Sequence, residues 1–155
     1  MELLPQHGAG VTRRWQGKFV MDVGWAMYVG PAAATTLHAH HAIQIVVGLD
    51  APVRLRQGDR NPWRAYDGAV VPADQPHQLE ASEGDLALIY FEPEGPDGRR
   101  LEVAMTGCGV AALPTVIVRR LRCMLVSNGP TLSETSRAYG ELLQALALPE
   151  ARRAI

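Results

Sequence analysis

Histidine is the residue type in this sequence whose spacing suggests chemistry. His38 and His40 stand two positions apart in the segment HAHHAIQIVVGL, and Gln44 follows in the same segment. His77 comes later, at the end of PADQPH. Alternate residues of a β-strand point to the same face, about 7 Å apart, so His38, His40 and Gln44 would share one face. Two histidines from one strand and a third from a neighbouring strand can converge on a divalent metal ion.

The alternative is that these histidines are hydrogen-bonded side chains lining an interior, without a metal. Gln44 offers a neutral amide where a carboxylate would hold a divalent cation more strongly. If a metal is bound, we expect His38, His40 and His77 to be the ligands, with Gln44 as a possible fourth, and the ion to be Zn, Ni, Mn or Fe. His41 has the opposite parity, and we expect it to pack elsewhere or to meet solvent.

Strands must position these side chains, and the hydrophobic pattern from Lys18 to about Glu92 has their period of two. Residues 19–29 alternate as one strand and residues 37–49 as a second, and shorter runs follow between turn-forming residues. The polar segment QGDRNP at residues 57–62 predicts a hairpin connection. About seven short strands at this spacing favour a sandwich or a barrel.

After Pro93 the pattern becomes helical. Glu94–Gly98 is expected to be a loop, and Pro114 predicts the start of a helix. Thr131 and Glu134 form a capping box that predicts a second helix. The apolar stripes of these helices could pack inside one chain or pair two chains, and they comprise Leu121, Leu125, Leu142, Leu143 and Leu146.

Composition narrows the class of protein. A chain of 155 residues is one ordinary domain, and no apolar run approaches the ~20 residues of a membrane span. Cys108 and Cys123 are typical of a reduced, cytoplasmic protein. The net charge of −1 gives no general reason to expect nucleic-acid binding, although residues 1–97 carry 7 basic and 12 acidic side chains and residues 98–155 carry 8 and 4.

The histidine motifs resemble those of the cupin superfamily. In that pattern H-x-H is followed by Glu or Gln, and P-x-G-x-x-H comes on a later strand. Here Gln44 stands where Glu is usual, and Asp74 stands where Gly is usual in Pro72-x-Asp74-x-x-His77. With HAHHAIQIVVGLDAPVRLR, AVVPADQPHQL, Glu92-Pro93 and a two-helix tail, residues 18–155 resemble the N-terminal domain of AraC-type transcription regulators.

The resemblance implies a mainly β fold, in which a cupin-like antiparallel β-barrel or jelly roll is followed by an antiparallel pair of α-helices. It divides the chain into an N-terminal arm (1–17), a barrel (18–93), a connecting segment (94–113), a dimerising helical hairpin (114–148) and the start of a linker (149–155). A small effector would bind in the lumen, lined by His38, His40, Gln44, His77 and Trp25. The homodimer would meet DNA only through a further domain, because neither predicted helix has a helix-turn-helix pattern.

Two other function classes remain open from the sequence. A stand-alone metal-dependent cupin enzyme, a dioxygenase or an isomerase, would need the metal and usually a carboxylate base. No further carboxylate has interior-facing spacing next to the histidines, which favours an effector-sensing domain without catalytic residues. A purely structural dimer module is the third class, and an empty apolar lumen would support it.

Overall fold

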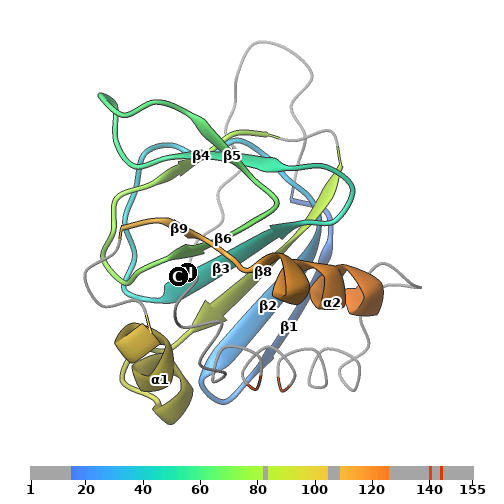
Figure 1. Ribbon diagram of the computed structural model, residues 1–155, viewed down its shortest axis with the longest axis vertical. Coiled ribbons are helices and arrows are strands. Elements are labelled where there is room, and N and C mark those ends of the chain that lie inside the picture. Colours follow the sequence, from blue (N-terminus) through green and yellow to red (C-terminus); the bar gives the residue numbers. More distant parts are fainter. Residues whose placement is uncertain (1–14, 82–83, 105–108, 126–139, 141–143, 145–155) are drawn as a thin grey trace.

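The computed structural model describes residues 15–81, 84–104 and 109–125, together with residues 140 and 144. Within this part of the chain the strands form two antiparallel sheets, accompanied by two helices that follow the last long strand (Figure 1). The mainly β architecture predicted from the period-two pattern is confirmed. Its described strands remain in two separate sheets and do not close into one barrel. No helix of this part of the chain is long and apolar enough to cross a membrane.

The large sheet has six strands, β1 (Lys18–Asp22), β2 (Trp25–Pro31), β3 (Ile43–Gly48), β6 (Gly68–Val71), β8 (Asp85–Phe91) and β9 (Ala111–Ala112). Their order across the sheet is β1-β2-β8-β3-β6-β9. The small sheet consists of β4 (Val53–Arg56), β5 (Arg64–Tyr66) and β7 (Gln78–Leu79), in the order β5-β4-β7. The helices are α1 (Pro96–Ala104) and α2 (Thr115–Leu125).

Two groups of buried side chains lie on opposite faces of the large sheet. The outer core is formed on the face that α2 covers, and it joins Ile43, Ile45 and Val47 of β3 to residues of the helix (Figure 1). The inner core combines side chains of both sheets, so it lies between them, and it comprises Tyr28, Ala32, Val46, Val53, Leu55, Ala69, Val71, Leu79, Leu86, Leu88 and Tyr90. The alternation along β3 therefore sends successive side chains to different cores, as its period of two predicts.

The first predicted strand, residues 19–29, is wrong because the chain reverses in its middle. Val23 and Gly24 form a turn between β1 and β2, which pair antiparallel as a hairpin. Gly24 adopts a φ of 82°, a left-handed conformation that glycine reaches without steric cost. The Asp22 side chain accepts a hydrogen bond of 2.7 Å from the backbone N–H of Val23 and so supports the turn.

The second predicted strand, residues 37–49, is too long, since β3 begins only at Ile43. Before it, His38 forms an isolated β-bridge with His77. Local bonds compete with a continuing ladder here, because the His38 ring donates to Thr36 O at 2.7 Å and the His40 ring donates to Ala42 O at 2.9 Å. The histidines thus lie on the segment that leads into the strand and not on the strand itself.

The segment after β8 contains more structure than expected. The loop predicted at Glu94–Gly98 is wrong in its second half, because α1 begins at Pro96. Proline is favoured at the first helical position, where its missing N–H has no helical partner to lose, and Asp97 in the first turn suits the helix dipole. The helix predicted after Pro114 is confirmed as α2.

Leu121 and Leu125 of α2 are buried in the outer core, with exposed fractions of 1% and 2%. They therefore pack inside one chain and are not available to a second subunit, which corrects the dimer-contact hypothesis for this pair. The helix predicted from Thr131, with Leu142, Leu143 and Leu146, falls outside the described residues.

Candidate metal centre

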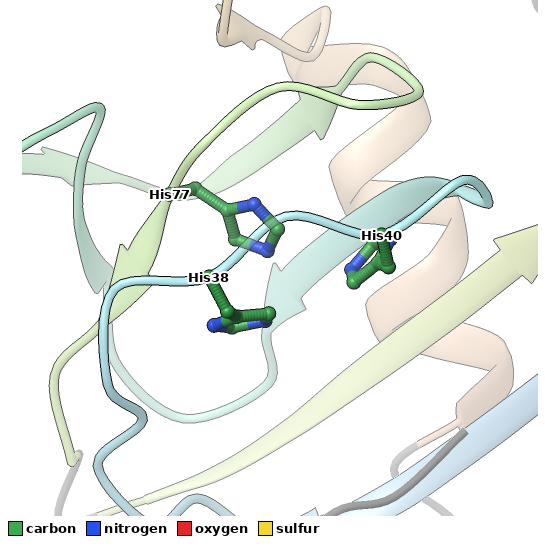
Figure 2. Close-up of side chains that lie close together, drawn as sticks. All are labelled: His38, His40 and His77. Atoms are coloured by element: carbon green, nitrogen blue, oxygen red, sulfur yellow. The ribbon is translucent and has the colours of Figure 1, made fainter.

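Two segments that are distant in the sequence bring the three histidines together (Figure 2). His38 and His40 lie on the segment before β3, and His77 lies just before β7. The backbone amide of His38 donates to His77 O at 3.0 Å, and that of His77 donates back to His38 O at 2.8 Å. A further bond of 2.9 Å runs from the Asp74 amide to His40 O. Backbone hydrogen bonds thus fix the two segments against each other.

The three imidazole rings form one compact group. Their potential ligand nitrogens all lie within 4.8 Å of one another. The ring centroids of His38 and His77 are 4.4 Å apart, those of His40 and His77 are 4.9 Å apart, and those of His38 and His40 are 5.6 Å apart. The three histidines that we expect to be metal ligands from the sequence therefore lie together in the structure.

Hydrogen bonds fix the same tautomer in all three rings. Each Nδ1 lies within bonding distance of a backbone oxygen two residues away, at 2.7, 2.9 and 2.8 Å for Thr36, Ala42 and Gln75 respectively. A carbonyl oxygen only accepts, so Nδ1 carries the proton and the neutral ring keeps its lone pair on Nε2. Histidines that bind metals commonly have this arrangement, in which one nitrogen donates to a fixed acceptor and the other faces the ion.

Gln44 reaches the same group from β3. Its side-chain Oε1 lies 2.8 Å from His40 Nε2 and 3.2 Å from His77 Nε2, and the residue is only 3% exposed. If both rings are protonated on Nδ1, the Gln44 oxygen faces the Nε2 lone pairs of His40 and His77. These three acceptor atoms repel one another unless a cation lies between them. Alternatively the amide turns over and its NH₂ group donates to both rings. Gln44 can therefore coordinate an ion through its oxygen, or donate hydrogen bonds to the Nε2 atoms of His40 and His77 when no ion is bound.

Burial keeps His77 uncharged. The side chain is 1% exposed, and desolvation lowers its pKa from 6.5 to about 4, with smaller lowering effects from His38 and His40. The hydrogen bond to the backbone oxygen of Gln75 opposes this shift. A metal ion requires a neutral imidazole, so His77 is ready for coordination at neutral pH without releasing a proton.

The donor set fits a divalent transition metal. Imidazole nitrogens suit Zn, Fe and Ni, and an amide oxygen can complete the set. Nitrogens that lie about 2.1 Å from one ion in a tetrahedral set are about 3.4 Å apart, so each of the three ligand nitrogens would move inward by about 1 Å on binding an ion. Among the residues that the structure describes, His38, His40 and His77 are grouped without a carboxylate.

Trp25 does not belong to this site, which corrects its assignment to the lumen. It lies opposite Phe91 in the β2–β8 ladder, whereas its neighbour Ala26 lies opposite Tyr90. Cross-strand partners share a face, so Trp25 points to the outer core together with Ile43. The hairpin turn before β2 means that parity counted from β1 says nothing about the face of Trp25.

Tyr90 is a site residue that the sequence analysis missed. Its ring lies 5.6 Å from the His40 ring in an edge-on arrangement. Burial raises the pKa of its hydroxyl, which therefore stays a phenol and can donate a hydrogen bond. The signal was its parity in DLALIYF, where it shares the inner face with Leu86 and Leu88.

His41 faces away from the group and is exposed, as its parity predicted. Its Nδ1 lies 3.2 Å from an Asp74 oxygen, and its Nε2 meets a Glu94 oxygen. The hydrogen bond with Glu94, followed by that with Asp74, raises the pKa of His41 above its usual 6.5. His41 thereby links three loops next to the histidine group.

No family model matches the chain, and no curated protein matches it. Among solved structures, a cupin-2 domain containing protein from Shewanella frigidimarina is similar over 51% of this chain and 82% of its own, with 14% identity and a TM-score of 0.41. An RmlC-like cupin protein from Desulfovibrio desulfuricans is similar over 58% and 97%, with 14% identity and a TM-score of 0.40. The DMSP lyase DddQ from Ruegeria pomeroyi is similar over 48% and 41%, with 20% identity and a TM-score of 0.38. These scores are low, so the function proposed below rests on the geometry of the site.

Proposed function

We propose that the chain is a cupin-like sensor domain that holds a divalent transition-metal ion at His38, His40 and His77 and binds a small effector beside it. The observation that supports this is the convergence of three imidazoles whose Nδ1 atoms are all occupied by backbone oxygens. Three neutral imidazoles whose ligand nitrogens lie within 4.8 Å of one another are suited to hold a cation.

Each residue of the site has a definite part in this proposal. The three histidines hold the ion, and Gln44 supplies an amide oxygen as a further ligand. Tyr90 covers one side of His40 and offers a phenol beside the site. When bound, the ion would supply Lewis-acid attraction for an oxygen or nitrogen donor of the effector.

Sensing is favoured over catalysis by the chemistry around the histidines. A dioxygenase or isomerase of the cupin type would ordinarily use a carboxylate as base or ligand. The grouped ligand residues of the described chain are three histidines without Asp or Glu, and Gln44 occupies the position from which a carboxylate would act. Burial also keeps the Tyr90 phenol protonated, so it is a poor general base at neutral pH.

The sensor proposal includes the partners that the AraC-type resemblance implies. The chain would form a homodimer, and its contact with DNA would come through a separate DNA-binding domain. Leu121 and Leu125 are core residues, so the pairing surface must lie elsewhere, for example at Leu142, Leu143 and Leu146. Light scattering over a range of concentrations tests the dimer, and a strict monomer at high micromolar concentration would contradict it.

Metal content provides the test of the histidine site. Protein purified without a histidine tag should carry about one transition-metal ion per chain by mass spectrometry, and His40→Ala and His77→Ala should each lose it. His41→Ala is the matched control, because His41 is adjacent in sequence yet bonds to carboxylates outside the group. A full metal complement in the double variant of His40 and His77 would refute the assignment.

A further inference from the structure

The β4–β5 hairpin forms a cavity that shares no lining residue with the histidine centre. Its volume is about 160 Å³, and Leu55 forms its buried apolar part. Hydrogen-bond donors dominate the remaining lining, which includes Arg56, Gln57, Asn61, Arg64 and Tyr66 and has no acidic residue. We propose that this cavity binds a small oxyanion, a phosphate or a short-chain carboxylate.

The strand register directs two of the donors to the inner side of the small sheet. Arg64 lies opposite Leu55 in the β4–β5 ladder, and Tyr66 lies opposite Val53. Leu55 and Val53 both belong to the inner core, and cross-strand partners share a face. Arg64 and Tyr66 therefore project from the inner face of an edge strand, where a guanidinium and a phenol adjoin the buried Leu55.

Arg56 forms part of the cavity wall, and neighbouring residues hold its guanidinium. Its Nε donates to Gln78 Oε1 at 2.7 Å, and its guanidinium lies 4.9 Å from the centre of the Trp63 ring. Asp59 approaches one terminal nitrogen at 3.5 Å, but its side chain is 77% exposed, so solvent screens this pair. Arg56 lies opposite Gln78 in the β4–β7 ladder and has the other parity from Leu55, so its guanidinium projects from the outer face of the small sheet and adds positive charge beside the cavity.

Arg64 has an unused charge. Its side chain makes no ion pair or hydrogen bond with any residue that the structure describes, whereas the side chain of Arg54, one strand away, pairs with Glu80 at 3.0 Å. Gln57 accepts a bond of 3.1 Å from the Val110 amide through Oε1, which leaves its NH₂ group to donate. Planar guanidinium groups bind carboxylates and phosphates through paired N–H bonds, so the free donors match an oxyanion.

The size of the cavity limits the ligand. Pockets for drug-sized molecules have volumes of roughly 300–1,000 Å³, and this one is smaller. The Arg64 guanidinium, the neutral amide and phenol donors and the lack of a lining carboxylate disfavour a cation or a neutral apolar molecule. The remaining class is a compact anion with several acceptor oxygens.

An NMR titration of the metal-free chain with inorganic phosphate tests this inference. At about 0.15 M NaCl, which screens diffuse attraction, the side-chain signals of Arg64, Asn61 and Gln57 should shift and saturate. Arg64→Ala should weaken phosphate binding by about tenfold or more, since it removes a charged hydrogen-bond donor. Arg54→Ala is the matched control and should bind phosphate like the original chain. Thermal unfolding of both variants verifies that they are folded.

Two results would overturn the inference. Shifts that never saturate indicate no site, and equal weakening in Arg64→Ala and Arg54→Ala indicates only a general positive surface. A parallel titration with succinate distinguishes the two ligand chemistries, because tighter succinate binding assigns the cavity to carboxylates and tighter phosphate binding assigns it to phosphates. The titration is done without metal, so its failure leaves the proposed histidine site untouched.

Discussion

Gln44 and Tyr90 lie directly opposite each other in the β3–β8 ladder, so both side chains project to the inner side of the large sheet. Tyr90 packs edge-on against His40, and the Gln44 amide faces His40 and His77. Each residue is therefore fixed by the central strands of the sheet, while the histidines belong to the segments laid over them. The central strands of the large sheet and two hydrogen-bonded segments therefore define the site.

Replacing Gln44 by Glu should strengthen metal binding. A carboxylate adds a negative charge to three neutral imidazoles, and the affinity for Zn²⁺ should rise on the order of tenfold or more. The same variant should be less stable than the original chain without metal, because a carboxylate would then be buried next to two neutral rings. Competition with a chelator measures the affinity, and urea unfolding measures the stability. Unchanged affinity would exclude this residue from the ligand set.

Acid should destabilise the metal-free chain through His77. The pKa of its imidazole is about 4 in the folded state, against 6.5 for an unperturbed histidine, so the unfolded chain takes up the proton first as the pH falls. The stability contributed by neutral His77 is complete above pH 6.5 and decreases between pH 6.5 and 4, by about 3 kcal/mol in total. Unfolding of the original chain and of His77→Gln, both with chelator, should show a shallower pH dependence in the variant. Parallel curves would mean that His77 is not the group responsible.

His41 should titrate above the ordinary range. The Glu94 and Asp74 carboxylates favour its protonated form, so its pKa should lie above 6.5 and fall toward that value in Glu94→Gln. This contribution to stability is present below the unfolded value of 6.5 and is lost as the pH rises through the folded pKa. Histidine ring signals in NMR spectra give the pKa directly. Glu80→Gln, which changes a carboxylate paired with Arg54, should leave it unchanged.

Leu121→Ala should cost about 2–5 kcal/mol of unfolding free energy, as expected for truncating a buried leucine. Val116→Ala on the same helix is the control, because Val116 is 57% exposed and its loss should change stability by less than about 0.5 kcal/mol. Denaturant unfolding provides both values. A large loss of dimer with little loss of stability in Leu121→Ala would place this leucine at an interface and not in the core.

The site was more predictable from the sequence than the strands that carry it. The spacing of His38, His40 and Gln44 was sufficient to predict that these side chains lie together. A β-bridge at His38 and a strand from Ile43 keep them on the same side of the chain. The start of this strand differs from the expectation because hydrogen bonds from the histidine rings to nearby backbone oxygens compete with the ladder, and hydrophobic periodicity contains no information on such bonds.

The differences at the first predicted strand and at the leucine stripe arise from a turn and from tertiary packing, respectively. A single glycine with positive φ, Gly24, converts one alternating run into a hairpin and so changes the face assigned to Trp25. A stripe of leucines on a helix has the same sequence pattern whether it packs against its own sheet or against another chain. For Leu121 and Leu125 the structure distinguishes the two, because both are buried in the outer core. Periodicity therefore predicts which side chains share a face, but the residues that pack against that face depend on the tertiary structure.

The pair of backbone bonds between His38 and His77 has a consequence for protein engineering. Since the main chain alone provides both donors and both acceptors, exchanging either ring for another side chain leaves this connection intact. The scaffold can therefore accept different donor types at these two positions, such as cysteine or aspartate, and each exchange would tune which ion is preferred without rebuilding the surrounding strands. Because the backbone pairing does not depend on the side chains, positions 38 and 77 are a suitable starting point for the redesign of metal selectivity.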